Sequence, residues 1–92
     1  MTTKDNNNLW HVYIIECSDK TLYTGITNNL RRRIQEHNSG NGCRFTKFRR
    51  PLKLLHKEKF FSKIEALKRE KEIKGLRRDK KLQLIQALPV LD

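Results

Sequence analysis

Two short runs rich in β-branched and aromatic residues lie only three residues apart near the start of this chain. They are Trp10–Cys17 and Thr21–Thr27, and the composition of the intervening Ser18–Lys20 is typical of a tight turn. Such runs favour extended strands over helices. The sequence therefore predicts an antiparallel β-hairpin as the first unit of the fold.

The segment after the hairpin predicts a helix, a loop and one more strand. Thr27 or Asn28 can cap a helix over residues 29–38, which a glycine-containing segment then ends. A basic, aromatic loop over residues 43–50 leads through a proline into a third strand, residues 52–59. Because a proline precedes this strand, we expect it at an edge of the sheet.

Two further helices are predicted in the second half of the chain. Ser62 can cap the first, over residues 63–74, and Gly75 can end it. The second covers residues 77–87. The residues expected to face the core are Ile64, Ala66, Leu67 and Ile73 in the first, and Leu82, Ile85 and Leu88 in the second. These elements make a small α+β fold.

The length of the chain sets its domain organisation. With 92 residues it has room for one compact domain, which we place at residues 9–92. Residues 1–8 are polar and rich in asparagine, so we expect a disordered leader there.

The chain is strongly basic, which bears on its partners. Lys and Arg number 21 against 10 Asp and Glu, giving a formal net charge of +11 and a pI near 10.1. This charge favours nucleic acid as the partner and a monomer as the oligomeric state. No apolar run approaches the roughly 20 residues that span a bilayer, and no signal-peptide pattern opens the chain. We therefore expect a soluble cytoplasmic protein with Cys17 and Cys43 as reduced thiols.

Two tyrosines stand out in the predicted hairpin. Tyr13 and Tyr23 lie on the paired strands, and a period of two lets both project from one face. Gly25 lies two residues after Tyr23, and a glycine inside a strand often marks the close approach of a ligand or another backbone. The alternative is an ordinary cross-strand aromatic pair beside a bulge glycine.

Arg33 and His37 lie four residues apart in the first predicted helix and so share a face. A guanidinium suits phosphate and an imidazole titrates near neutral pH, so the pair suits anion binding with proton transfer. The alternative is a solvated basic helix with a histidine at the edge of the core. Glu70 falls on the apolar side of the second helix, where a carboxylate needs a metal ion or an ion-pair partner.

The loop at residues 43–50 interleaves cations with aromatic rings, a composition that serves phosphate contacts and base stacking. Phe45 or Phe48 could instead fill the core. His11 and His56 are interpreted as structural, because neither has a partner at metal-ligand spacing. The candidate nucleic-acid contacts are Arg32, Arg44, Lys47, Arg49 and Arg50.

Taken in order, four short motifs resemble those of the GIY-YIG nuclease superfamily. They are His11-Val-Tyr13, Tyr23-Thr-Gly25, Arg33-x-x-x-His37 and Ala66-Leu-Lys-Arg-Glu70. The chain is most similar to the small stand-alone bacterial branch, in which the nuclease module is nearly the whole protein. The resemblance implies a three-stranded antiparallel sheet flanked by about three helices, in agreement with the fold class inferred from the residues.

The resemblance also implies roles for the motif residues. In relatives the two tyrosines face the scissile phosphate, the helix arginine contacts it, and the glutamate holds one divalent cation. Those roles fall on Tyr13, Tyr23, Arg33 and Glu70, while His37 matches a histidine that often completes the site. A tyrosine base needs its pKa lowered by nearby positive charge, for which Arg33, His37 and the metal are the candidates. Either tyrosine could take the proton, with a slight preference for Tyr13.

The function that this resemblance implies is metal-dependent hydrolysis of a nucleic-acid backbone with one Mg²⁺ or Mn²⁺ ion. We expect DNA rather than RNA, selected by structure, because the separate recognition domain of larger relatives is missing. Two departures are visible: His11 replaces the glycine of the first motif, and no asparagine follows Glu70. The alternatives are a basic DNA- or RNA-binding domain that never cuts, and an interaction protein on a larger assembly.

Overall fold

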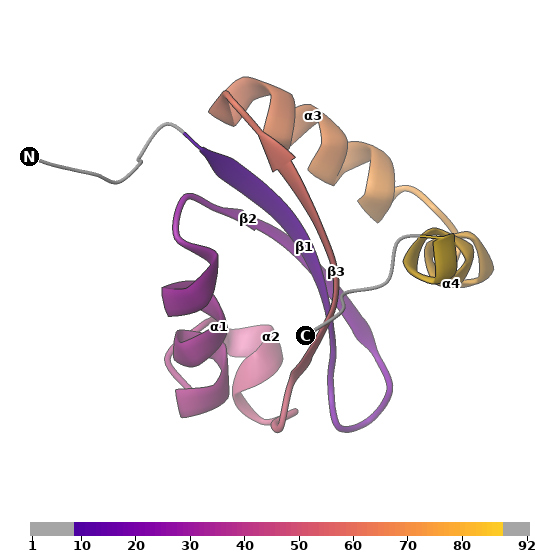
Figure 1. Cartoon of the computed structure of the whole chain (residues 1–92). Coiled ribbons are helices and arrows are strands. Elements are labelled where there is room, and N and C mark those ends of the chain that lie inside the picture. The colour runs from indigo at the N-terminus through magenta and orange to yellow at the C-terminus, as the bar shows by residue number, and fades with distance from the viewer. Residues whose placement is uncertain (1–8, 88–92) are drawn as a thin grey trace, which may run out of the picture.

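A three-stranded antiparallel sheet forms the centre of the molecule, as predicted. The structure is a computed structural model and describes residues 9–87, so the predicted leader and Leu88 lie outside the described residues. The strands are β1 (Trp10–Glu16), β2 (Leu22–Thr27) and β3 (Lys53–Phe60), in the order β2-β1-β3. The hairpin joins β1 to β2, and β3 lies at the predicted edge (Figure 1).

Helices cover both faces of this sheet (Figure 1). The first two, α1 (Leu30–Ser39) and the short α2 (Arg44–Lys47), lie on one side, whereas α3 (Lys63–Lys74) and α4 (Arg78–Ala87) lie on the other. Of the four helices, α2 was not predicted. It is a single helical turn within the segment that was expected to be a loop. It carries no apolar repeat that could have indicated a helix.

The alternation of side chains along β1 divides the core into two clusters. Val12 and Ile14 pack with α3 and α4, while Tyr13 and Ile15 pack on the side of α1. All four residues are buried. The central strand is therefore apolar on both faces, and one of those faces carries a tyrosine.

The caps of the helices agree with the sequence in one case and correct it in another. Ser62 caps α3 by accepting the backbone N–H of Glu65, as predicted. For α1 the cap is Asn29, which accepts the N–H of Arg32 at 3.1 Å. The prediction of Thr27 or Asn28 is wrong, because the Thr27 hydroxyl instead accepts the N–H of Asn29 and orients the cap residue.

The buried face of α3 is narrower than predicted. Ala66 and Ile73 are fully buried, whereas Ile64 and Leu67 are 67% and 43% exposed. Ala66 and Ile73 are seven residues apart and share one face of the helix, whereas Ile64 lies on the opposite face and Leu67 at the flank. In α4, Leu84 and Ile85 pack against the core and Leu82 is half-buried. No helix within residues 9–87 is long and apolar enough to cross a membrane.

Candidate active site

The two motif tyrosines lie on the same face of the hairpin, as predicted. Tyr13 is paired with Gly25 and Ile15 with Tyr23, so the two tyrosines are diagonal neighbours across the strands. Their ring centroids are 6.4 Å apart, and Tyr13 is only 1% exposed. This places two phenol groups under α1.

Gly25 is required by the ring of Tyr13. A Cβ atom at residue 25 would lie 2.5 Å from the Tyr13 hydroxyl oxygen and 2.8 Å from Cζ. The prediction of a close approach at this glycine is therefore confirmed, although the approaching group is a side chain of the protein and not a ligand or backbone. Any larger residue would push the phenol out of its position.

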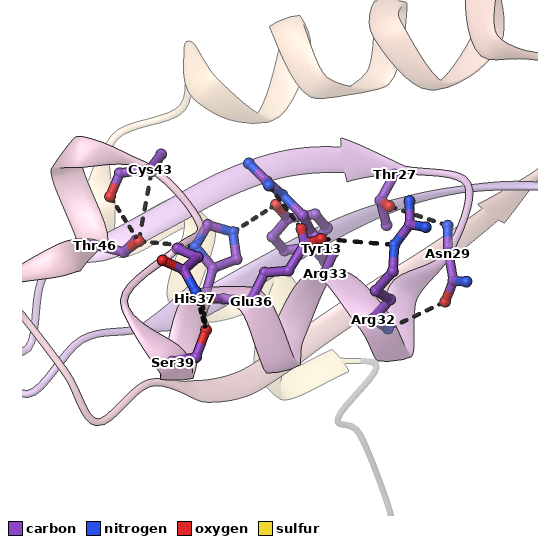
Figure 2. A network of polar contacts seen from close by, with 11 residues as sticks. Tyr13, Thr27, Asn29, Arg32, Arg33, Glu36, His37, Ser39, Cys43 and Thr46 are labelled. Atoms are coloured by element: carbon purple, nitrogen blue, oxygen red, sulfur yellow. Dashed lines mark hydrogen bonds and ion pairs between the residues drawn. The ribbon is translucent and has the colours of Figure 1, made fainter.

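His37 extends from α1 toward Tyr13 (Figure 2), and its ring also contacts that of Tyr23. It is fully buried, and its Nε2 lies 3.0 Å from the Tyr13 hydroxyl oxygen. Its Nδ1 lies 2.8 Å from the Thr46 hydroxyl oxygen at the end of α2. The alternative of a histidine at the edge of the core is therefore wrong. The imidazole is buried and hydrogen-bonded at both nitrogens.

Arg33 lies one turn before His37 on the same face of α1, as the spacing predicted, and both act on Tyr13. Its guanidinium forms an ion pair with Glu36 at 3.1 Å and lies close enough to the Tyr13 hydroxyl to act against the rise in the pKa of that phenol. The side chain remains 29% exposed, so part of the guanidinium is open to solvent or to a ligand. Arg33 can therefore touch an incoming phosphate and Tyr13 together.

Burial controls the charge state of the site. It raises the pKa of Tyr13, against which the Arg33 guanidinium acts, and it raises the pKa of Tyr23 to about 12. Burial, with the Arg33 charge, lowers the pKa of His37 to about 4. The expectation that His37 supplies positive charge is wrong, because the buried imidazole is neutral at pH 7. Arg33 is the cation of this cluster.

Glu70 approaches the tyrosines from α3, which covers the opposite face of the sheet (Figure 1). Its charge acts to raise the pKa of Tyr13, so the carboxylate lies within electrostatic reach of the phenol. The side chain is 18% exposed, and Oε2 pairs with the Lys74 ammonium at 3.2 Å. The carboxylate is therefore largely, but not fully, buried, and its ion-pair partner is a half-exposed lysine and not one of the arginines.

One carboxylate is a small donor set for a metal ion. Within residues 9–87, no group of three or more His, Cys, Asp or Glu side chains could hold a metal ion. Mg²⁺ is nevertheless often bound by one or two carboxylates together with water and substrate phosphate oxygens. Once released from Lys74, the single carboxylate of Glu70 fits this mode of binding. It does not fit a metal site made of protein ligands alone.

The basic segment after α1 lies beside the tyrosines, and its phenylalanines are exposed. Phe45 stacks on Tyr23 with centroids 5.6 Å apart, and Phe48 is 83% exposed. Filling of the core by either ring is therefore ruled out. A hollow of about 450 Å³ opens between Phe48 and the end of α1. Its lining residues are Gly40, Asn41, Cys43, Arg44, Lys47 and Phe48.

The five predicted nucleic-acid contacts divide into two groups. Arg32 forms an ion pair with Glu36, Arg49 forms one with Asp19, and Arg50 donates to the carbonyls of the preceding turns. Arg44 and Lys47 have no carboxylate partner within the described part of the chain. These two line the hollow and, of the five, are the cations most available to a phosphate.

The remaining histidines and cysteines lie apart from this cluster or at its edge. His56 is buried beside Glu58 at 2.7 Å, and Glu58 in turn pairs with Arg69. This is the structural role expected of His56. His11 is half-buried on β1. Both cysteines are free thiols, as expected, and Cys43 is the one that lies close to the tyrosines.

Comparison with known proteins decides the family. The model of the GIY-YIG catalytic domain matches residues 9–83. The chain belongs to the GIY-YIG family. The matched range includes all four motifs, and the match confirms the resemblance inferred from them.

The similar proteins are small and come from bacteria and archaea. A UPF0213 protein of Syntrophus aciditrophicus is 58% identical over 80 residues, covering 86% of this chain and 92% of that protein. The UPF0213 protein HQ_3675A of Haloquadratum walsbyi is 49% identical, covering 87% and 90%. Their names state no activity.

Two solution NMR structures share the fold. The protein EF2693 of E. faecalis is 37% identical with a TM-score of 0.63, over 91% of this chain and 90% of that one. The UPF0213 protein BH0048 of Bacillus halodurans is 44% identical with a TM-score of 0.58, over 86% and 84%. The α+β architecture is therefore that of the GIY-YIG relatives.

Two residues of the cluster were not predicted from the sequence. Thr46 is fully buried and holds Nδ1 of His37. Gly42 passes so close to His37 that a Cβ there would lie 2.2 Å from Nδ1. The spacing between Gly42 and Thr46 carries no recognisable motif, and only the fold of the α1–α2 connection brings them onto the histidine.

Proposed function

We propose that this GIY-YIG chain is a metal-dependent nuclease that hydrolyses a phosphodiester bond, with DNA favoured over RNA. The observation that carries the proposal is the contact of Tyr13 with both Arg33 and His37, on a hairpin whose glycine is shaped to that tyrosine. A structural aromatic pair would need neither a buried neutral histidine nor a half-exposed arginine at one hydroxyl group.

Each residue has a task that its geometry supports. Arg33 compensates the charge that develops on a non-bridging phosphate oxygen, because its guanidinium is part-exposed beside Tyr13. Tyr13 orients the attacking water and takes up its proton, since the Tyr13 proton can pass to the Nε2 lone pair of neutral His37 at 3.0 Å. This route does not require Tyr13 to be a phenolate before the substrate arrives.

Glu70 is the residue that would hold one Mg²⁺ or Mn²⁺ ion. When bound there, the cation supplies Lewis acidity and stabilises the departing oxyanion. Two carboxylates lie within electrostatic reach of Tyr13, Arg33 and His37. Glu36 is held by Arg32 and Arg33, whereas Glu70 pairs with one half-exposed lysine, so Glu70 is the carboxylate more available to a cation. Its pairing with Lys74 keeps the carboxylate neutralised in the absence of substrate.

One observation favours the second candidate, a nucleic-acid-binding domain that does not cut. Both tyrosines have raised pKa values, so neither is a ready base at pH 7. A chain of charge +11 would still bind a polyanion through phosphate contacts. Affinity alone cannot separate these two functions.

Cleavage of a labelled substrate panel tests the proposal. The panel holds single-stranded, duplex and branched DNA and the matching RNAs, each incubated with Mg²⁺, Mn²⁺ or a chelator. We expect cutting of at least one DNA substrate with either ion and none with the chelator. Binding of every substrate with no cleavage under any condition would leave the binding domain as the function.

A second prediction concerns the basic surface. Replacing both Arg44 and Lys47 by alanine should weaken DNA binding and lower the slope of log K against log salt by about 2, because two phosphates are no longer neutralised. The matched control is Lys68→Ala with Lys71→Ala, which removes the same charge from exposed positions of α3 on the other face. Equal slopes for the two variants would show that binding follows net charge and not this surface.

A further inference from the structure

The Tyr13–His37 pair belongs to a longer chain of hydrogen bonds (Figure 2). Beyond His37 Nδ1 lies the Thr46 hydroxyl at 2.8 Å, and the Thr46 oxygen in turn lies 3.3 Å from the Cys43 carbonyl. At the other end, the Arg33 guanidinium approaches the Tyr13 hydroxyl. Tyr13, His37 and Thr46 therefore connect the Arg33 guanidinium with the Cys43 carbonyl oxygen. Apart from Tyr13, all of these groups belong to α1 or to the segment that follows it.

The two ends of this chain determine its direction. The Arg33 guanidinium acts on the Tyr13 hydroxyl but has no acceptor atom, so it offers no place for the Tyr13 proton. The acceptor at hydrogen-bond distance is Nε2 of His37, which must then carry the lone pair. At the far end, the Cys43 carbonyl can only accept, so the Thr46 hydroxyl donates its proton to that carbonyl.

Both constraints lead to the same tautomer. With the Thr46 proton directed to the Cys43 carbonyl, the Thr46 oxygen is free to accept a proton from Nδ1–H of His37. With the proton on Nδ1, the Nε2 lone pair faces Tyr13, as the first constraint requires. The reversed chain would deprive the buried Tyr13 proton of Nε2, the acceptor that lies at hydrogen-bond distance.

The position of Gly42 independently indicates that the fold holds the His37 ring in place. Its Cα lies against the imidazole so closely that a Cβ would be 2.2 Å from Nδ1 and 2.7 Å from Cγ of His37. The ring could not move aside to relieve this contact, because it is fully buried. The α1–α2 segment therefore clamps the ring from one side with Gly42 and holds Nδ1 with Thr46.

We propose that Thr46 is a positioning residue of the active site, which fixes His37 in the Nδ1–H tautomer and so directs the Tyr13 hydroxyl proton onto Nε2. Thr46 touches no substrate and acts through His37. The lone pair of Tyr13 that does not face Arg33 is then left for the attacking water. The consequence for rate rests on the proposed nuclease function, whereas the tautomer is a property of the free protein.

The test measures the tautomer of His37 directly, by the ¹⁵N chemical shifts of its two ring nitrogens in long-range ¹H–¹⁵N NMR spectra at pH 7. The wild type should show a protonated Nδ1 and a bare Nε2. Thr46→Ser should keep that pattern, while the nearly isosteric Thr46→Val should shift His37 toward Nε2–H. An Nε2–H wild type, or a Thr46→Val spectrum identical to wild type, would overturn the proposal.

The wild-type and serine measurements need no destabilised variant, so the proposal can be tested even if Thr46→Val does not fold. In the cleavage assay, Thr46→Val should lose about tenfold or more of the rate with unchanged substrate affinity, and Thr46→Ser should recover most of it. If the wild type cuts nothing, the proposed nuclease function fails while the tautomer result stands. If Thr46→Val cuts at the wild-type rate, the positioning role is wrong and the nuclease function is kept.

Discussion

Replacing Glu70 by glutamine is expected to lower metal-dependent cleavage by about a thousandfold or more. A bound cation contributes several kcal/mol to stabilising the transition-state charge, and about 4 kcal/mol corresponds to three powers of ten. Glutamine keeps the size of the side chain but removes the charge that would anchor the cation. The Glu70 side chain is part-exposed and pairs with the half-exposed Lys74, so the fold should tolerate the change.

Glu72→Gln is the matched control for this experiment. It makes the same chemical change two residues later on α3, where the carboxylate is 66% exposed and pairs with Arg69 at 3.1 Å. Exposed ion pairs contribute about 1 kcal/mol or less, so stability and cleavage should stay close to wild type. The affinity for duplex DNA at fixed salt should change by the same amount in Glu70→Gln and Glu72→Gln. Unchanged cleavage by Glu70→Gln, with Mg²⁺ still required, would remove Glu70 from the metal site.

A second measurement separates metal binding from cleavage. Titration of Mn²⁺ into the free protein should broaden the NMR signals of residues beside Glu70 in the wild type and in Glu72→Gln. Glu70→Gln should lose this broadening. Loss of cleavage without loss of Mn²⁺ binding would mean that the carboxylate acts on the substrate and not on the cation.

Local sequence signals predicted most of the fold because each needed only neighbouring residues. The hairpin followed from two β-rich runs with a short turn, and the bounds of α3 followed from Ser62 and Gly75. Two local details were predicted wrongly: the cap of α1, where Thr27 binds the backbone of the cap residue Asn29, and the width of the buried face of α3. Ile64 and Leu67 are exposed because the face that meets the sheet is the one shared by Ala66 and Ile73, which the choice of partner surface decides.

In the candidate site too, some features could be predicted from short-range rules and others could not. Tyr13 and Tyr23 were placed together by strand pairing, and Arg33 and His37 by helical spacing, both of which are short-range rules. The neutral state of His37 could not be predicted, because it depends on burial under a segment folded back from α1. Thr46 was missed for the same reason.

The hydroxyl of Tyr13 is expected to carry most of the proton transfer. Tyr13→Phe should lower the cleavage rate by about 10²–10⁴-fold, the usual range for general acid–base groups, with Tyr23→Phe at least tenfold less severe. Tyr13 has an acceptor for its proton in His37 Nε2, whereas Tyr23 is beside Cys43 and its pKa is about 12. Single-turnover cleavage rates of both variants, with binding measured in parallel, check this expectation.

The pH dependence of the Tyr13 effect identifies the route of the proton. If Tyr13 had to be a phenolate, the ratio of the wild-type rate to that of Tyr13→Phe would rise about tenfold per pH unit toward its raised pKa. If the proton passes through Tyr13 to neutral His37, the ratio should be flat from pH 6 to 9. It should then fall as the pH approaches about 4, because His37 protonates there and can no longer accept. Since the fold raises both tyrosine pKa values while keeping His37 neutral, we expect the flat profile.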